Sequence, residues 1–132
     1  MSYGQSVPVD LVYSQSSGCL YLADSEDVRA LIAFGYSGKG AARDNPACQG
    51  LRSEGPIPRG MWKLHPAVDH IRLGPCAIPL TPVGHDALGR SGFFIHGDNP
   101  RGDRSASSGC IVLPKEIRLA IGLLRCKSLL VE

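Results

Sequence analysis

Residues 93–113 read FFIHGDNPRGDRSASSGCIVL, with an apolar run at each end and a polar, glycine-containing loop between them. Short apolar runs bounded by turn-forming residues predict two β-strands joined by a connection. His96 ends the first run, and Cys110 stands directly before the second. If the two strands are neighbours, a base and a potential nucleophile face each other across the mouth of the loop, which is the arrangement that thiol catalysis requires.

The residues beside this pair favour a catalytic interpretation over a structural one. A histidine and a cysteine taken at random are better explained as a hydrogen-bonded strand end and a core thiol. Here Gly97 follows the histidine, and Ser107, Ser108 and Gly109 precede the cysteine. Gly109 permits a close backbone approach, and we expect the backbone amides of this turn to point at a developing oxyanion.

The length and composition indicate one β-rich domain. A chain of 132 residues is long enough for one core and too short for two, so we expect a single domain over residues 1–132. Sixteen glycines and ten prolines favour short strands and frequent turns over a helix bundle. The formal net charge is +2 and the basic residues are scattered, so we expect no nucleic-acid partner.

The sequence shows no sign of a membrane span or a secretory signal. No apolar run reaches the roughly 18 to 20 residues that a membrane helix needs. Residues 1–5 lack the basic start and the apolar core of a signal peptide, so we expect synthesis in the cytoplasm and export by another route.

The cysteines and histidines predict no metal site and no cofactor. The odd set of five cysteines contains no C-x-x-C pair, which argues against a zinc knuckle and a complete disulfide framework. We expect plain thiols at the positions outside the loop, with one disulfide as the alternative in an oxidising compartment. These positions are Cys19, Cys48, Cys76 and Cys126.

The first half of the chain predicts strands followed by a long loop. Residues 9–24 predict a hairpin, with strands at 11–13 and 20–22 around a turn at 16–18. Residues 28–34 fit a helix or a strand equally well, because the apolar run is short. Residues 35–60 have no periodic pattern and predict a long loop, which in a compact domain is either functional or poorly ordered.

The second half of the sequence predicts more strands and one helix. A strand is expected at 61–64, and one or two more at 71–80, broken by Gly74-Pro75 and Pro79, before a polar connection at 81–91. A helix is expected at 114–125 and a final strand at 128–132. The apolar stripe expected to pack this helix on the sheet consists of Ile117, Ala120, Ile121 and Leu124.

The loop motif resembles the signature of YkuD-type L,D-transpeptidases, in which an H-G or H-S strand end precedes an S-H-G-C-[IV] segment. In this chain the matching residues are His96-Gly97 and Ser107-Ser108-Gly109-Cys110-Ile111. The segments GPIPRG at 55–60 and GRSGFFIHGD at 89–98 are similar to a subgroup of type VI secretion L,D-transpeptidase effectors. Ser108 stands where many family members have a histidine, and Val112 where many have an arginine.

This resemblance implies a YkuD-like β-sheet or sandwich with one C-terminal helix and acyl transfer on peptidoglycan stem peptides. Cys110 would be the nucleophile and His96 the base, without a cofactor or a metal. Gly109, Gly97 and Ser108 would form the oxyanion site or orient the catalytic pair. The expected substrate-binding residues are Ser107, Asp98 and Arg90.

We therefore expect an L,D-transpeptidase or L,D-carboxypeptidase that works through a thioacyl-enzyme. It would act in the periplasm, either as a toxin delivered into a rival cell or as a prophage enzyme. Peptidoglycan is the expected partner, and an immunity protein and a secretion apparatus are further possible partners. The alternative is a non-catalytic peptidoglycan-binding module with the same fold.

Overall fold

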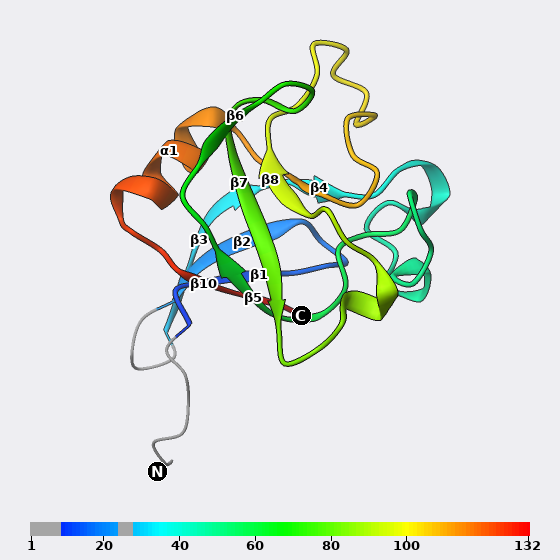
Figure 1. Ribbon diagram of the computed structural model, residues 1–132, viewed down its shortest axis with the longest axis horizontal. Helices are drawn as coiled ribbons and strands as arrows, with labels where there is room; N and C mark the ends of the chain where they lie inside the picture. Colours follow the sequence, from blue (N-terminus) through cyan, green and yellow to red (C-terminus); the bar gives the residue numbers. More distant parts are fainter. Residues whose placement is uncertain (1–8, 24–27) are drawn as a thin grey trace.

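The computed structural model describes residues 9–23 and 28–132, and Figure 1 shows a mainly β fold over this part of the chain. The described residues contain one α-helix, α1 (Lys115–Leu123), so the expected fold class is confirmed. Residues 1–5, on which the expectation of a missing secretory signal rests, lie outside the described residues. So does Asp24, the end of the expected hairpin.

The strands of the described residues form one mixed sheet. Its order is β3-β2-β1-β10-β5-β7-β8-β9-β4, and β6 pairs with β7 beside this path. The pairs β1 with β10 and β8 with β9 are parallel, whereas the other pairs are antiparallel. The strands are β1 (Leu11–Tyr13), β2 (Cys19–Ala23), β3 (Arg29–Phe34), β4 (Tyr36–Ser37), β5 (Gly60–Leu64), β6 (Val68–His70), β7 (Gly74–Val83), β8 (Phe94–His96), β9 (Ile111–Val112) and β10 (Ser128–Val131).

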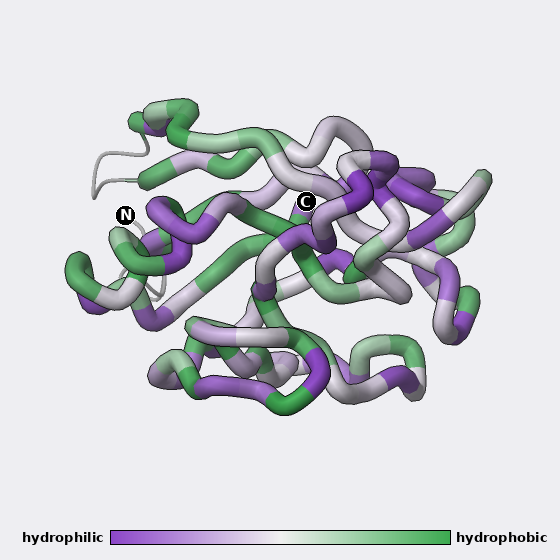
Figure 2. Tube along the Cα trace, turned by 90° about the horizontal axis from the view of Figure 1, so that it is seen from above, coloured by the Kyte–Doolittle hydropathy of each residue, from purple (hydrophilic) through white to green (hydrophobic). Residues whose placement is uncertain are grey.

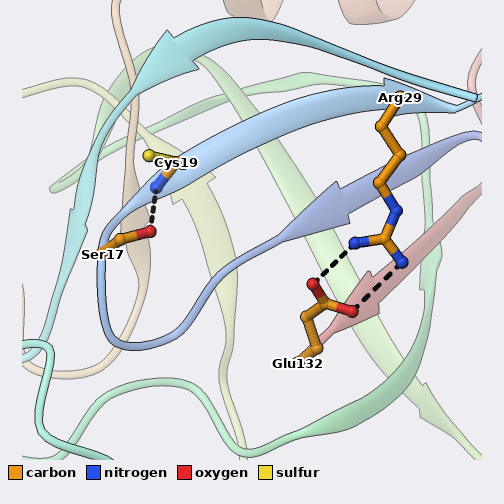
Figure 3. A network of polar contacts seen from close by, with 4 residues as sticks. All are labelled: Ser17, Cys19, Arg29 and Glu132. Atoms are coloured by element: carbon orange, nitrogen blue, oxygen red, sulfur yellow. Dashed lines mark hydrogen bonds and ion pairs between the residues drawn. The ribbon is translucent and has the colours of Figure 1, made fainter.

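The two ends of the described chain meet in the middle of the sheet. The predicted hairpin is confirmed as β1 and β2, and the segment that fitted either helix or strand is the edge strand β3. The predicted last strand is β10, which lies between β1 and β5. Figure 3 shows that the ion pair between Arg29 and Glu132, 2.7 Å, reaches from β3 to the C-terminal residue. Both side chains are partly exposed, so this pair adds little to stability.

The prediction that residues 71–80 are broken by prolines is wrong, because β7 runs from Gly74 to Val83 without interruption. Its partners change along its length, from β6 to β8 and then to β5. A proline is tolerated in a strand where its nitrogen does not face a ladder partner. Pro79 has Phe94 of β8 as its register partner, and its carbonyl accepts a hydrogen bond from the His65 N–H just beyond the end of β5. Residues 81–83 of the predicted connection belong to this strand as well.

Helix α1 is shorter than the 114–125 predicted, and Pro114 is its N-cap residue. Ile121 is buried in the core and Ile117 packs against it, as the stripe predicts. Leu124 follows the last helical residue and is exposed, so its place in the predicted stripe is wrong. Arg118 is the other buried residue of the helix, and its guanidinium donates to the carbonyls of Leu113, Pro75 and Cys76.

The hydrophobic core is built mainly from residues of the strands, and α1 contributes Ile121, with Ile117 packed against it. Figure 2 shows hydrophobic stretches of the chain passing through the middle of the molecule and hydrophilic stretches in several of the outer loops. Trp62 and Leu64 are both buried, which confirms that they share one face of β5. Ile95 of β8 and Ile111 of β9 are fully buried in the same core, so the strands that carry the candidate site are anchored there.

Replacing Ile121 with alanine is expected to lower the free energy of unfolding by about 2 to 5 kcal/mol, because a buried side chain is lost and a cavity remains. The matched control is Leu123→Ala in the same helix, where the leucine is 84% exposed and the expected change is below about 0.5 kcal/mol. Urea unfolding of both variants measures the difference. Equal losses would contradict the packing of α1 described above.

Candidate active site

The register of β8 and β9 places His96 and Cys110 on the same face of the sheet. The strands are parallel, with Ile95 opposite Ile111 and His96 opposite Val112. Because side chains alternate along a strand, the residues next to the two core isoleucines project from the other face. His96 and Cys110 are therefore diagonal neighbours, with Cα atoms roughly 8 Å apart from strand spacing and rise alone.

The Cys110 thiol is held by backbone groups of the strand beside it. Its Sγ accepts a hydrogen bond from the Phe94 N–H at 3.3 Å and lies 3.6 Å from the Gly92 carbonyl oxygen. The residue is half-buried and lines a cavity of about 290 Å³. The cavity is lined by Arg52, Ser53, Gly89, Arg90, Ser91, Gly92, Phe93, Ser108, Gly109 and Cys110. The sulfur is thus reachable from solvent, as a nucleophile must be.

Burial raises the pKa of the Cys110 thiol above its ordinary value. The Phe94 amide and the charge of Arg90 oppose this rise, because both favour the thiolate. In this conformation desolvation is the larger effect, so the thiol is mainly protonated at neutral pH. A base that removes its proton during the reaction is therefore required.

His96 has the properties of such a base. It is almost fully buried, and its Nδ1 lies 2.8 Å from the Gly97 carbonyl oxygen. A carbonyl oxygen only accepts hydrogen bonds, so Nδ1 carries the proton of the neutral ring and the Nε2 lone pair is left as the acceptor. Burial lowers the pKa of His96, against the hydrogen bond to Gly97 and with support from the nearby Arg118 charge. The ring is therefore neutral at neutral pH.

The structure does not bring the two side chains into direct contact. In the part of the chain that it describes, no hydrogen bond joins His96 to Cys110. His96 lines a second cavity, of about 450 Å³, together with Gly97 and Asp98. A direct proton transfer thus requires the Cys110 side chain to turn from the Phe94 amide toward His96.

The buried Arg90 side chain binds backbone carbonyls around the loop that carries Cys110. Its NH1 donates to the carbonyls of Gln49 and Pro56 at 2.6 and 2.8 Å, and its NH2 to those of Gly55 and Ser108 at 3.0 and 3.5 Å. The guanidinium carbon lies 5.0 Å from the centre of the Phe93 ring. These donors already have acceptors, so the contribution that the geometry supports is to hold the loop and to place a positive charge near the thiol.

The serines and glycines of the motif build the turn before Cys110. The buried Ser107 hydroxyl donates to the Cys110 carbonyl and accepts from the amides of Gly38 and Gly109. The Gly109 amide therefore already has an acceptor in this conformation. Gly109 has φ +143, and a Cβ there would lie 2.5 Å from Arg90 NH2, which explains the need for glycine. Ser108 is exposed and lines the cysteine cavity.

Gly97 and Asp98 lie on the His96 side. A Cβ at Gly97 would come within 2.7 Å of Arg118 NH2, so the glycine lets the chain pass this buried cation. The Asp98 carboxylate accepts from the Tyr36 hydroxyl at 2.6 Å and from the Asn99 amide at 2.9 Å. Burial and this carboxylate raise the pKa of Tyr36 to about 12. Asp98 thus ties the loop after β8 to β4 and forms part of the wall of the histidine cavity.

Residues 35–60, the predicted long loop, form hydrogen bonds to the turn before Cys110. They contain β4 and two short 3₁₀ turns, Gly40–Ala42 and Pro46–Cys48. The buried Ser37 hydroxyl donates to the Gly109 carbonyl and accepts from the Ile57 amide, each at 2.8 Å. This segment is therefore a scaffold for the cysteine turn.

Most of the chain matches the model of a known protein family. A family model described as the Tlde1 domain matches residues 31–128, which cover β3 to the start of β10 and include both His96 and Cys110. The chain belongs to the Tlde1 domain family. This is a family of type VI secretion effectors related to L,D-transpeptidases. Neither the curated proteins nor the solved structures contained a match to the chain.

Two features of this Tlde1 domain escape prediction from residue types. The donor to the thiol is the backbone amide of Phe94, which any residue could supply. Arg52 lines the cysteine cavity from a loop whose sequence has no periodic pattern. The one sequence signal that connects Arg52 with the motif is its closeness to the GPIPRG segment at 55–60.

Two other observations concern all the residues that the structure describes. All five cysteines lie in the described parts of the chain and are free thiols. No helix of the described residues is both long and apolar enough to pass through a bilayer.

The pKa of His96 is expected to lie below the ordinary value of about 6.5 when the protein is folded. Folding then favours the neutral ring, so this contribution to stability is complete above pH 6.5 and is lost as the pH falls through the folded-state pKa. An NMR titration of the histidine Cε1 protons, assigned with His96→Gln, measures the midpoint. A midpoint at or above 6.5 would show that the ring is not desolvated as described.

Proposed function

We propose that this Tlde1 domain is a cysteine-dependent YkuD-type L,D-transpeptidase or L,D-carboxypeptidase that acts on the tetrapeptide stems of peptidoglycan. The observation that carries the proposal is the arrangement on β8 and β9. A reachable Cys110 thiol and a neutral His96 with Nε2 as acceptor project from one face of the same parallel pair. Membership of an effector family related to L,D-transpeptidases supports the substrate class.

In the proposed first step, the Cys110 sulfur attacks the carbonyl between the L-centre of meso-diaminopimelate and the terminal D-alanine. The thiol proton passes to His96 Nε2 after the side chain has turned from the Phe94 amide. The Cys110 amide is the proposed donor to the oxyanion, since the Gly109 amide is bonded to Ser107. When the C–N bond breaks, His96 returns the proton to the amine of D-alanine, and a thioester remains on Cys110.

The second step resolves the thioester. Water would give a tripeptide stem and a carboxypeptidase reaction, a D-amino acid would give exchange, and the amine of a second stem would give a 3-3 cross-link. In each case His96 takes a proton from the incoming nucleophile and the thiol is regenerated. Asp98 and Ser108, which lie at the walls of the two cavities, are the proposed contacts for the peptide.

The proposed setting is the periplasm. We propose delivery into a rival cell by a type VI apparatus, with carriage by a prophage as the other route, and an immunity protein as a partner in the producing cell. The family supports the effector role.

The second candidate is a peptidoglycan-binding module of the same fold without activity. It is favoured by the raised pKa of Cys110 and by the lack of a hydrogen bond between Cys110 and His96 among the described residues. The two candidates differ in turnover, so the same substitution distinguishes them.

Replacing Cys110 with alanine is expected to abolish the release of D-alanine from tetrapeptide muropeptides, because none of the other four thiols lines the cavity. Cys126→Ala is the matched control, since Cys126 is a half-buried thiol away from the cysteine cavity, and it is expected to keep full turnover. Mass spectrometry of the muropeptides measures both. Turnover retained in Cys110→Ala would remove the mechanism, and no turnover in the unmodified protein would favour the binding module.

A further inference from the structure

The cavity beside Cys110 is positively charged. The ten residues that line it include two arginines, Arg52 and Arg90, and no aspartate or glutamate. The volume of about 290 Å³ lies at the lower end of the range for small-molecule sites. The cavity therefore suits a small anionic group next to the sulfur, such as the end of a peptide.

The two arginines differ in how many donors they have left. The NH1 and NH2 groups of Arg90 are bonded to four backbone carbonyls. Arg52 is exposed, and its hydrogen bond in the described structure runs from NH2 to the Gly89 carbonyl at 3.1 Å. Among the described residues, no carboxylate lies within ion-pair distance of Arg52. Its remaining N–H groups are open to a ligand.

The position of Arg52 is fixed well enough to serve as a binding group. The bond to Gly89 holds the guanidinium against the segment that leads into Arg90. A Cβ at Gly89 would lie 3.6 Å from Arg52 NH2, so the two groups are in packing contact. Arg52 therefore lines the cavity as an anchored cation with unused donors.

We propose that Arg52 binds the free carboxylate of the terminal D-alanine of the stem peptide. This proposal rests on the proposed function, because it takes Cys110 as the group that attacks the last peptide bond. The attacked carbonyl and the terminal carboxylate then belong to neighbouring residues, whose Cα atoms are about 3.8 Å apart. The cation that selects this carboxylate must lie in the same small cavity as the sulfur, and Arg52 does.

The proposal assigns to Arg52 a charge that the segment after Cys110 does not supply. The segment after Cys110 carries Val112, which is apolar and buried, so it offers no charge to the substrate. Arg52 supplies that charge from a different segment. An arginine with open donors also binds a carboxylate with two parallel hydrogen bonds, which fixes the orientation of the bond to be cleaved.

The test measures binding separately from turnover. Cys110→Ala protein is titrated with the tetrapeptide L-alanyl-γ-D-glutamyl-meso-diaminopimelyl-D-alanine and followed by NMR. The same peptide is used with an amide in place of the terminal D-alanine carboxylate, and with an amide on the diaminopimelate carboxylate instead. The proteins compared carry Arg52, Arg52→Gln or Arg52→Lys. Arg59→Gln is the matched control, because Arg59 is an exposed arginine of the same loop that does not line the cavity.

With Arg52 present, the terminal amide is expected to weaken binding about tenfold, as for the loss of one charge-assisted contact. Arg52→Gln should bind the free peptide about tenfold more weakly and lose the preference for the carboxylate, Arg52→Lys should keep part of it, and Arg59→Gln should keep all of it. Equal binding of acid and terminal amide by the Arg52 protein would overturn the proposal. So would a preference that follows the diaminopimelate carboxylate, or no saturable binding of any of the peptides.

Failure of this proposal is distinguishable from failure of the proposed function. If Cys110→Ala loses D-alanine release and the acid and amide peptides bind equally, the proposed enzymatic function stands. The proposed binding of the terminal carboxylate by Arg52 then fails. Turnover that survives in Cys110→Ala would remove the mechanism, whatever the result of the titrations.

Discussion

The parallel pairing of β8 with β9 is the constraint on which the rest of the candidate site depends. With Ile95 opposite Ile111 in the core, the side chains of His96 and Cys110 must leave from the other face of the pair. A register shift of one residue would turn one of them into the core and separate them completely. The long segment before β5 protects this register, because Ser37 fixes the Gly109 carbonyl and Arg90 holds the carbonyls around it.

The protonation states in the site follow from the burial of the His96 and Cys110 side chains. Desolvation raises the pKa of the Cys110 thiol and lowers the pKa of His96, so both groups are neutral at neutral pH. A neutral thiol and a neutral imidazole on one face suit proton transfer during the attack, once the Cys110 side chain has turned, and do not suit a permanent ion pair. Arg90 and Arg52 place positive charge in the cavity that Cys110 lines, where the proposed thiolate would develop and the proposed carboxylate would bind.

Local sequence pattern was enough to predict β1, β2, β5, β8, β9 and β10, the single helix and the residues of the motif. It left β3 open between helix and strand, and it missed β6 and also β4, which lies inside the predicted long loop. The hairpin of β1 and β2 and the burial of Trp62 follow from alternation and turn chemistry, which act over a few residues. Pattern failed where long-range pairing decides the outcome. Pro79 lies inside β7 because that strand changes partners along its length, and Leu124 is exposed because α1 ends before it. In the site, the hydrogen bond from the Phe94 amide to the thiol and the unused donors of Arg52 depend on tertiary contacts, which residue types alone do not predict.

The central claim is that Cys110 becomes acylated by the stem peptide with the help of His96. The most direct test is intact-protein mass spectrometry after brief incubation with tetrapeptide muropeptide and an acid quench, followed by peptide mapping. The account predicts an added acyl group of the tripeptide stem on Cys110, which His96→Ala does not accumulate. Release of D-alanine without any adduct on Cys110, or an adduct on another residue, would contradict it.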